Sequence, residues 1–223
     1  MHHVRLNVLA TRECSISMSD NPGFDTALQF VLRWEGGFVD HPNDRGGGTN
    51  KGVTQRVYDS WRHRQNSPVQ DVKLITDGEV YAIYLCDYWL PARCDRLTTA
   101  LSTVQFDTAV NMGAERAVRF LQAAAGCHVD GDFGPVTERA IVGCDPYTMI
   151  AAYCHRREAF YIGLARDSPK LAVFLKGWLN RLNALRRDVG LPGFESASDA
   201  LDFGDTAYIA RVPDMGEDSM SPN

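Results

Sequence analysis

Residues 33–54 read RWEGGFVDHPNDRGGGTNKGVT, which places an acidic residue at the end of an apolar helical pattern and a glycine-rich loop after it. The acidic residue, Glu35, takes the next position in an apolar stripe of helical spacing. That stripe consists of Phe24, Ala27, Leu28, Val31 and Leu32. A carboxyl group turned inward at a helix C-terminus is disfavoured in its charged form by burial and by the nearby backbone carbonyls. The pattern predicts a protonated general acid; the alternative is a glutamate that reaches solvent or pairs with Arg33 or Arg45.

The loop after Glu35 carries a second acid in a contrasting environment. Asp44 lies among glycines and polar residues, where we expect it to stay exposed and ionised. Two such acids suggest glycoside cleavage, in which one protonates the leaving oxygen and the other acts on the opposite face of the sugar. Thr49 is a short polar residue that could hold a water molecule. The alternatives are an ordinary flexible turn and a phosphate-binding nest, although no G-K-[ST] follows the glycines.

The composition predicts a folded chain that does not bind nucleic acid. Of its 223 residues, 44% are hydrophobic, and the formal net charge of −5 is concentrated near the end. Residues 192–223 contain seven acidic residues and one arginine, so no clustered basic face is expected. No apolar run approaches the length of about 18–20 residues that spans a membrane, and the first twenty residues contain no secretory h-region.

The cysteine and histidine patterns favour neither a metal site nor a thiol enzyme. No C-x-x-C or H-E-x-x-H pattern occurs, so no metal and no cofactor are expected. The residues that follow Asp130 do not match the ligand positions of a calcium-binding loop. They instead favour a rigid turn that leads into a helix beginning at Pro135. The six cysteines are expected to be reduced and mostly buried thiols. They are Cys14, Cys86, Cys94, Cys127, Cys144 and Cys154.

Outward from the opening stretch, helical periodicity dominates and predicts a mainly α fold. A small irregular β-hairpin is expected near the glycine loop, with residues 38–39 pairing with 52–54. Asn21 and Thr76 are expected N-caps, the latter with capping-box spacing to Glu79. The expected helices cover residues 22–35, 55–64, 77–89, 101–112, 114–125, a short segment from 135, 146–166 and 168–187.

Three residues are candidates for substrate binding. Trp89 could stack on a sugar ring, although an aromatic residue in a helix is more often part of the core. Asp107 and Asn111 are four residues apart and share one helix face. A substrate contact is one interpretation of this pair, and a hydrogen bond between helices is the other.

Residues 34–54, WEGGFVDHPNDRGGGTNKGVT, resemble the signature of the glycoside hydrolase family 108 N-acetylmuramidases, which are phage-endolysin-like enzymes. The family pattern runs approximately E-G-G-[YF]-x-x-x-P-x-D-x-G-G-x-T-x-x-G-[IV]-T. The segment VDGDFGPVT at 129–137 is similar to the family's C-terminal peptidoglycan-binding part, and FLKGWLNR at 174–181 to its closing helix. The resemblance covers approximately residues 24–188.

The resemblance implies a lysozyme-like fold that cleaves between N-acetylmuramic acid and N-acetylglucosamine, with Glu35 as the essential acid. The order Glu35, Asp44, Thr49 is similar to the Glu–Asp–Thr arrangement of phage-type lysozymes, although Thr49 falls one residue short of that spacing and Asp40 is a competing acid. Two other functions are considered: a lytic transglycosylase that gives 1,6-anhydro products, and a non-catalytic protein for wall binding or secretion.

The chain is expected to divide into four parts. Residues 1–20 form an extension that is expected to be disordered, residues 21–113 the catalytic muramidase region, residues 114–190 a helical peptidoglycan-binding region packed on it, and residues 191–223 a flexible acidic tail. The expected partners are peptidoglycan glycan strands and a holin-type membrane pore. Synthesis in the cytoplasm without a signal peptide, followed by action on the cell wall in the periplasm or outside the cell, is the expected localisation.

Overall fold

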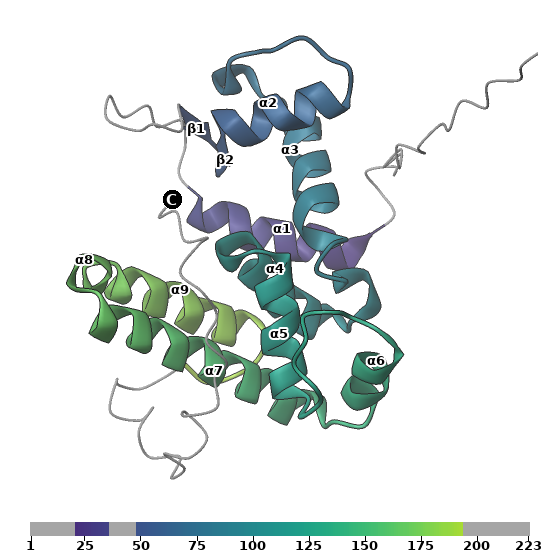
Figure 1. Cartoon of the computed structure of the whole chain (residues 1–223), viewed down its shortest axis with the longest axis vertical. Coiled ribbons are helices and arrows are strands. Elements are labelled where there is room, and N and C mark those ends of the chain that lie inside the picture. Colours follow the sequence, from purple (N-terminus) through teal and green to yellow (C-terminus); the bar gives the residue numbers. More distant parts are fainter. Residues whose placement is uncertain (1–20, 36–47, 194–223) are drawn as a thin grey trace, which may run out of the picture.

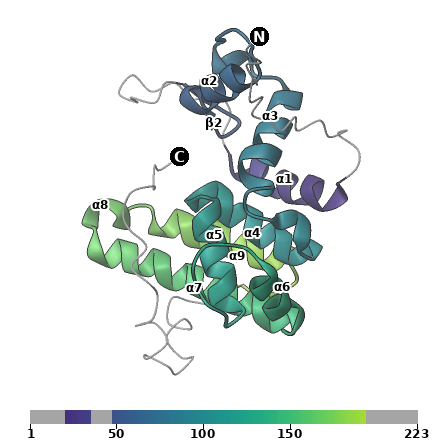
Figure 2. The ribbon, with the colours of Figure 1, turned by 45° about the vertical axis from the view of Figure 1, so that its right-hand side comes forward.

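The structure, a computed structural model, describes residues 21–35 and 48–193 and confirms a mainly α, lysozyme-like fold with one small antiparallel sheet. Figure 1 shows two parts, with the hairpin, α2 and the beginning of α3 above, and α4 to α9 below. Figure 2 shows the same division after a 45° turn. In chain order the elements are α1 (Pro22–Trp34), β1 (Thr49–Asn50), β2 (Val53–Thr54), α2 (Gln55–Arg64), η1 (Val72–Leu74), α3 (Asp77–Tyr84), η2 (Leu85–Trp89), η3 (Cys94–Arg96), α4 (Thr99–Met112), α5 (Ala114–Ala124), α6 (Pro135–Val142), α7 (Pro146–Asp167), α8 (Pro169–Ala172) and α9 (Leu175–Asp188).

Local signals in the sequence set the helix starts. The Asn21 side chain caps α1 by accepting from the Phe24 amide, and Pro22 takes the first turn, where no amide hydrogen is needed. The Thr76 and Glu79 side chains form the expected capping box of α3. These starts confirm the sequence-based expectation.

The hairpin differs from the expectation in its first strand. Val53–Thr54 pairs with Thr49–Asn50, in the register Thr49 to Thr54 and Asn50 to Val53. Lys51 and Gly52, the turn residues, both have positive φ, as a two-residue turn of the I′ kind requires. Residues 38–39, the expected partner strand, lie outside the described residues.

The core surrounds α4, which lies between α1 on one side and α5 and α7 on the other (Figure 1). Polar as well as apolar residues of α4 are buried, including Gln105 and Asp107. A helix buried on nearly all sides must satisfy its polar groups through neighbouring helices. Gln105 does so by donating to the Ala92 carbonyl and accepting from the Tyr153 hydroxyl.

Two of the predicted helices and the predicted state of the cysteines are corrected by the structure. The predicted helix 77–89 changes at Leu85 into a π-helical turn, in which the Leu90 amide donates to the Leu85 carbonyl. The predicted helix 168–187 is divided into the single turn α8 and the longer α9. Cys86 is disulfide-bonded, so not all the cysteines are reduced. Cys94, Cys127, Cys144 and Cys154 are free.

Within residues 21–35 and 48–193, no helix combines the length and the apolar character needed to cross a membrane.

Candidate active site

Glu35 is the C-cap residue of α1, and its side chain is turned into the protein. Its amide still donates to the Val31 carbonyl at 3.2 Å, but its backbone has left the helix. The side chain is only 6% exposed, as the apolar stripe predicted. Of the two arginines considered as its partners, Arg33 pairs instead with Asp188, and Arg45 lies outside the described residues.

The partner of Glu35 comes from α9, far along the chain. Arg181 Nη1 donates to Glu35 Oε1 at 3.0 Å, and the Arg181 side chain is 12% exposed. This ion pair joins the end of α1 to α9. Arg181 lies 146 residues further along the chain, so the local pattern around Glu35 does not contain this charge.

The turn of the hairpin packs directly against the same carboxyl group. A Cβ atom added to Gly52 would lie 2.8 Å from Glu35 Oε2 and 2.3 Å from the Tyr84 hydroxyl oxygen. With φ at +76° the position also favours glycine for conformational reasons. Gly52 therefore permits the close approach of the hairpin to Glu35.

Tyr84 closes the other side of this contact. Its hydroxyl donates to the Lys51 carbonyl at 3.1 Å and so connects α3 to the hairpin turn. Burial, and then the charge of Glu35, raise the pKa of the Tyr84 phenol far above its ordinary value. Tyr84 is therefore a neutral hydrogen-bond donor beside Glu35.

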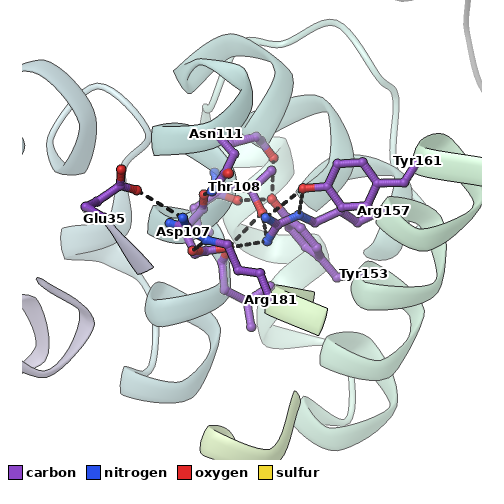
Figure 3. Close-up of polar contacts among 11 residues, drawn as sticks. Glu35, Asp107, Thr108, Asn111, Tyr153, Arg157, Tyr161 and Arg181 are labelled. Atoms are coloured by element: carbon purple, nitrogen blue, oxygen red, sulfur yellow. Dashed lines mark hydrogen bonds and ion pairs between the residues drawn. The ribbon is translucent and has the colours of Figure 1, made fainter. Parts of the chain in front are cut away.

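Behind Arg181 lies a network of buried charges (Figure 3). Arg181 Nε donates to Asp107 Oδ1 at 2.8 Å, and Arg157 Nη1 lies 2.6 Å from Asp107 Oδ2. Asp107 and Arg157 are completely buried. Burial alone would raise the pKa of Asp107, but the charges of Arg181 and Arg157 outweigh it and hold that pKa below its ordinary value.

Arg157 extends the network into α7. Its Nε and Nη2 atoms donate to the Tyr161 hydroxyl at 3.1 and 3.0 Å, and its Nη1 donates to Thr108 Oγ1 at 3.3 Å. Figure 3 shows the resulting order, with Glu35 at one end, Asp107 and Arg181 in the middle and Tyr161 at the other end. The network therefore connects α1, α4, α7 and α9.

The three predicted substrate-binding residues differ in burial and in the contacts that they make. Asp107 has no exposed surface and joins helices, the second of the two interpretations of this residue. Asn111 is half-buried, and its Nδ2 donates to the Asp107 carbonyl at 2.6 Å. Trp89 is 2% exposed and packs edge-on against Phe24 and Phe106, so its ring belongs to the core.

Of the other two predicted catalytic residues, Thr49 lies within the described residues and Asp44 does not. Thr49 is half-buried on β1, in the hairpin whose turn contacts Glu35. Asp44 lies outside the described residues, as does Asp40.

Sequence reasoning missed Arg181, Gly52 and Tyr84 as neighbours of Glu35. A signal was present for two of them, because Gly52 belongs to the opening stretch and Arg181 ends the segment 174–181. Their contact with Glu35 depends on tertiary packing, which a local pattern does not contain.

An open depression of about 620 Å³ lies beside α1, away from the Glu35 carboxyl group. Glu35 is not among its lining residues, which are Thr26, Gln29, Phe30, Leu32, Arg33 and Asp188. It is therefore separate from the Glu35 site. No group of three or more histidine, cysteine, aspartate or glutamate side chains in the described part of the chain is placed to hold a metal ion.

Two family models match the chain one after the other. The model described as Glycosyl hydrolase 108 matches residues 28–113, and the model described as Predicted Peptidoglycan domain matches residues 116–183. Among solved structures, the chain is similar to Brucella abortus SagA, with 30% identity, a TM-score of 0.64, and coverage of 76% of this chain and 95% of that chain. No curated protein matches. Glu35 lies in the first matched region and Arg181 in the second.

Proposed function

Because the chain belongs to the glycosyl hydrolase 108 family, we propose that it cleaves the bond between N-acetylmuramic acid and N-acetylglucosamine with Glu35 as the general acid. The two matched regions make it a glycosidase that acts on peptidoglycan. The particular bond and the role of Glu35 are the proposal. Peptidoglycan glycan strands are its substrate and partner.

The placement of Glu35 is the single observation that supports this role most strongly. Its carboxyl group is nearly excluded from water, fixed by Arg181 on one side and covered by Gly52 and Tyr84 on the other. An ordinary glutamate at a helix end extends into solvent instead. A carboxyl group held in one orientation beside a hairpin can deliver its proton to one defined oxygen atom.

The proposed reaction is hydrolysis. Glu35 gives its proton to the glycosidic oxygen, the bond from this oxygen to the anomeric carbon breaks, and the electron pair remains on the leaving oxygen. Water adds to the anomeric carbon and loses a proton to a base. We propose Asp44 as this base, with Thr49 positioning the water; both assignments rest on the sequence pattern and on the position of Thr49 in the hairpin beside Glu35.

Replacement of Glu35 by glutamine tests the role of the acid. Glu35→Gln keeps the shape of the side chain but removes the transferable proton, so the rate of wall lysis should fall about 10²–10⁴-fold. The measurement is the loss of turbidity of purified peptidoglycan, with circular dichroism to verify the fold. The control is Glu138→Gln, which removes an ion pair with Arg96 and should lyse walls at the wild-type rate. Wild-type lysis by Glu35→Gln would refute the role of the acid.

The route to the cell wall is a separate proposal. We propose export through a holin-type membrane pore, as the resemblance to phage endolysins suggests. Expression in bacteria with and without a coexpressed holin would test it: lysis only with the holin supports the route, and equal lysis in both contradicts it.

A further inference from the structure

We infer that Arg181 is a positioning residue of the active site, and that the region matched as a peptidoglycan domain therefore completes the active site. The inference rests on the proposed role of Glu35 as the acid. It assigns to residues 116–183 a part in the reaction that is distinct from holding the wall.

The guanidinium group of Arg181 is held at two points. Arg181 uses two different nitrogen atoms on two different carboxylates, Nη1 on Glu35 and Nε on Asp107, at 3.0 and 2.8 Å. A planar fork held at two points cannot rotate freely, so it fixes the orientation of Glu35. A lysine has one nitrogen atom on a flexible stem and cannot reproduce this arrangement.

Arg181 is itself held in place by a buried anchor. Asp107, its anchor on α4, is completely buried and is also paired with Arg157 from α7. The four groups Glu35, Arg181, Asp107 and Arg157 comprise two carboxylates and two guanidinium groups, none more than 12% exposed. Their charges balance when Glu35 is ionised, which is its state just after it has given up its proton. Arg181 therefore stabilises the carboxylate that the reaction produces.

A second ion pair joins the same two helices but is exposed to solvent. Arg33 of α1 also pairs with Asp188 of α9, but these side chains are 60% and 41% exposed. Water screens such a pair, which therefore contributes little to holding the helices together. In the described part of the chain, α1 and α9 are thus joined by an exposed and a buried ion pair, and the buried one includes the proposed acid.

The charged and titratable groups described around Glu35 are Arg181 of α9, Tyr84 of α3 and Tyr88 of η2. The phenols of Tyr84 and Tyr88 stay neutral because burial raises the pKa of each. Arg181 is therefore the charged side chain described next to Glu35, and its loss removes the ion pair that orients the carboxyl group.

The test uses the full-length chain with Arg181→Lys and Arg181→Gln. Steady-state kinetics on soluble glycan oligomers prepared from peptidoglycan give kcat and KM, and sedimentation with insoluble peptidoglycan measures wall binding. Both variants should lose about 10–100-fold in kcat, because a misplaced acid transfers its proton poorly, while KM and wall binding change less than about threefold. The matched control, Asp188→Asn, removes the exposed ion pair and should leave kcat unchanged.

Circular dichroism decides which of the two Arg181 variants is folded and therefore assayed. Wild-type kcat in a folded Arg181 variant, or loss of wall binding in parallel with kcat, would overturn the inference. Failure of both variants to fold would assign Arg181 a purely structural role and would also overturn it. None of these results bears on Glu35→Gln, so an inactive Glu35→Gln together with a fully active Arg181→Lys would leave the proposed function standing without this inference.

Discussion

At the scale of single residues, Gly52 sets how closely the hairpin approaches Glu35. Any side chain there would meet both the Tyr84 hydroxyl and the Glu35 carboxyl group, and positive φ adds conformational strain. Gly52 has no reactive side chain, but the geometry of the site around Glu35 depends on it.

Gly52→Ala should lower both stability and activity. We expect the free energy of unfolding to fall by about 1–3 kcal/mol from backbone strain, and kcat to fall because the hairpin is pushed away from Glu35. Urea unfolding and wall lysis measure the two effects. Gly126→Ala is the matched control, since Gly126 has a similar φ of +70° and no atom near the added Cβ. Equal kcat in the two variants would show that the contact with Glu35 is unimportant.

Asp107 should make the fold sensitive to acid. Its pKa is lower in the folded state than in the unfolded chain, so its contribution to stability is complete above the unfolded value of about 3.9 and is lost as pH falls through the lower folded value. Asp107→Asn leaves Arg157 with an uncompensated buried charge and should cost about 3–5 kcal/mol at neutral pH.

Unfolding free energies measured from pH 7 to pH 2 test this expectation for Asp107. The wild type should lose stability more steeply below pH 4 than Asp107→Asn does. Asp167→Asn, which removes an exposed ion pair with Arg166, should cost less than about 1 kcal/mol. Parallel pH dependence in wild type and Asp107→Asn would contradict the assignment.

The single-residue predictions from sequence succeeded where a local pattern determines the environment. The apolar stripe correctly placed Glu35 inside, because helical periodicity fixes the direction of a side chain. The pattern could not supply Arg181, which lies 146 residues away and meets Glu35 only after α9 packs against α1. Trp89 also shows that a local pattern does not contain tertiary packing. Stacking on a sugar ring would require an exposed indole ring, but Trp89 is buried in the core.

At the scale of elements, one buried side chain organises the turn before α6. Gln122 of α5 donates to Asp130 Oδ1, the Asp132 carbonyl and Thr137 Oγ1, and accepts from the amides of Asp130 and Gly131. The sequence predicted a rigid turn at this place, and these hydrogen bonds account for its rigidity. The turn therefore belongs to the scaffold.

Gln122→Leu should destabilise the protein without changing the reaction. Leaving the part-buried amides of Asp130 and Gly131 without their acceptor should cost about 1 kcal/mol for each group, so a decrease in thermal midpoint is expected, with kcat within about twofold of wild type. Differential scanning calorimetry and wall lysis supply the measurements. Gln29→Leu, on the open face of α1, is the control and should keep the wild-type midpoint. A large loss of kcat in folded Gln122→Leu would mean that the turn acts in the reaction.

Helix positions were the most predictable part of the fold, because caps and prolines act within a few residues. The starts of α1, α3, α6 and α7 each follow such a signal. The π-helical turn of η2 and the break before α9 have no comparable signal. The pairing of Val53–Thr54 with Thr49–Asn50 was not foreseen, because a strand of two residues has too few side chains to specify its pairing; the predicted partner, residues 38–39, lies outside the described part of the chain.

At the scale of the whole molecule, the two matched regions share one core. Helices α4 and α5 lie on either side of the boundary between the two matches and pack together, and both contact α7 (Figure 1). The network from Glu35 to Tyr161 crosses the same boundary. The two regions should therefore unfold together.

Calorimetry tests this cooperativity directly. One transition is expected, with equal calorimetric and van't Hoff enthalpies. Two resolved transitions would show that the matched regions are independent domains, and the network would then be a contact between separate units.

The central claim is hydrolysis of the muramic acid linkage by a glycosidase of this family. Its most direct test is digestion of defined peptidoglycan in water enriched in oxygen-18, followed by mass spectrometry of the released fragments. The account predicts reducing N-acetylmuramic acid ends that carry one solvent oxygen atom. Fragments ending in 1,6-anhydro-muramic acid, or in reducing N-acetylglucosamine, would contradict it.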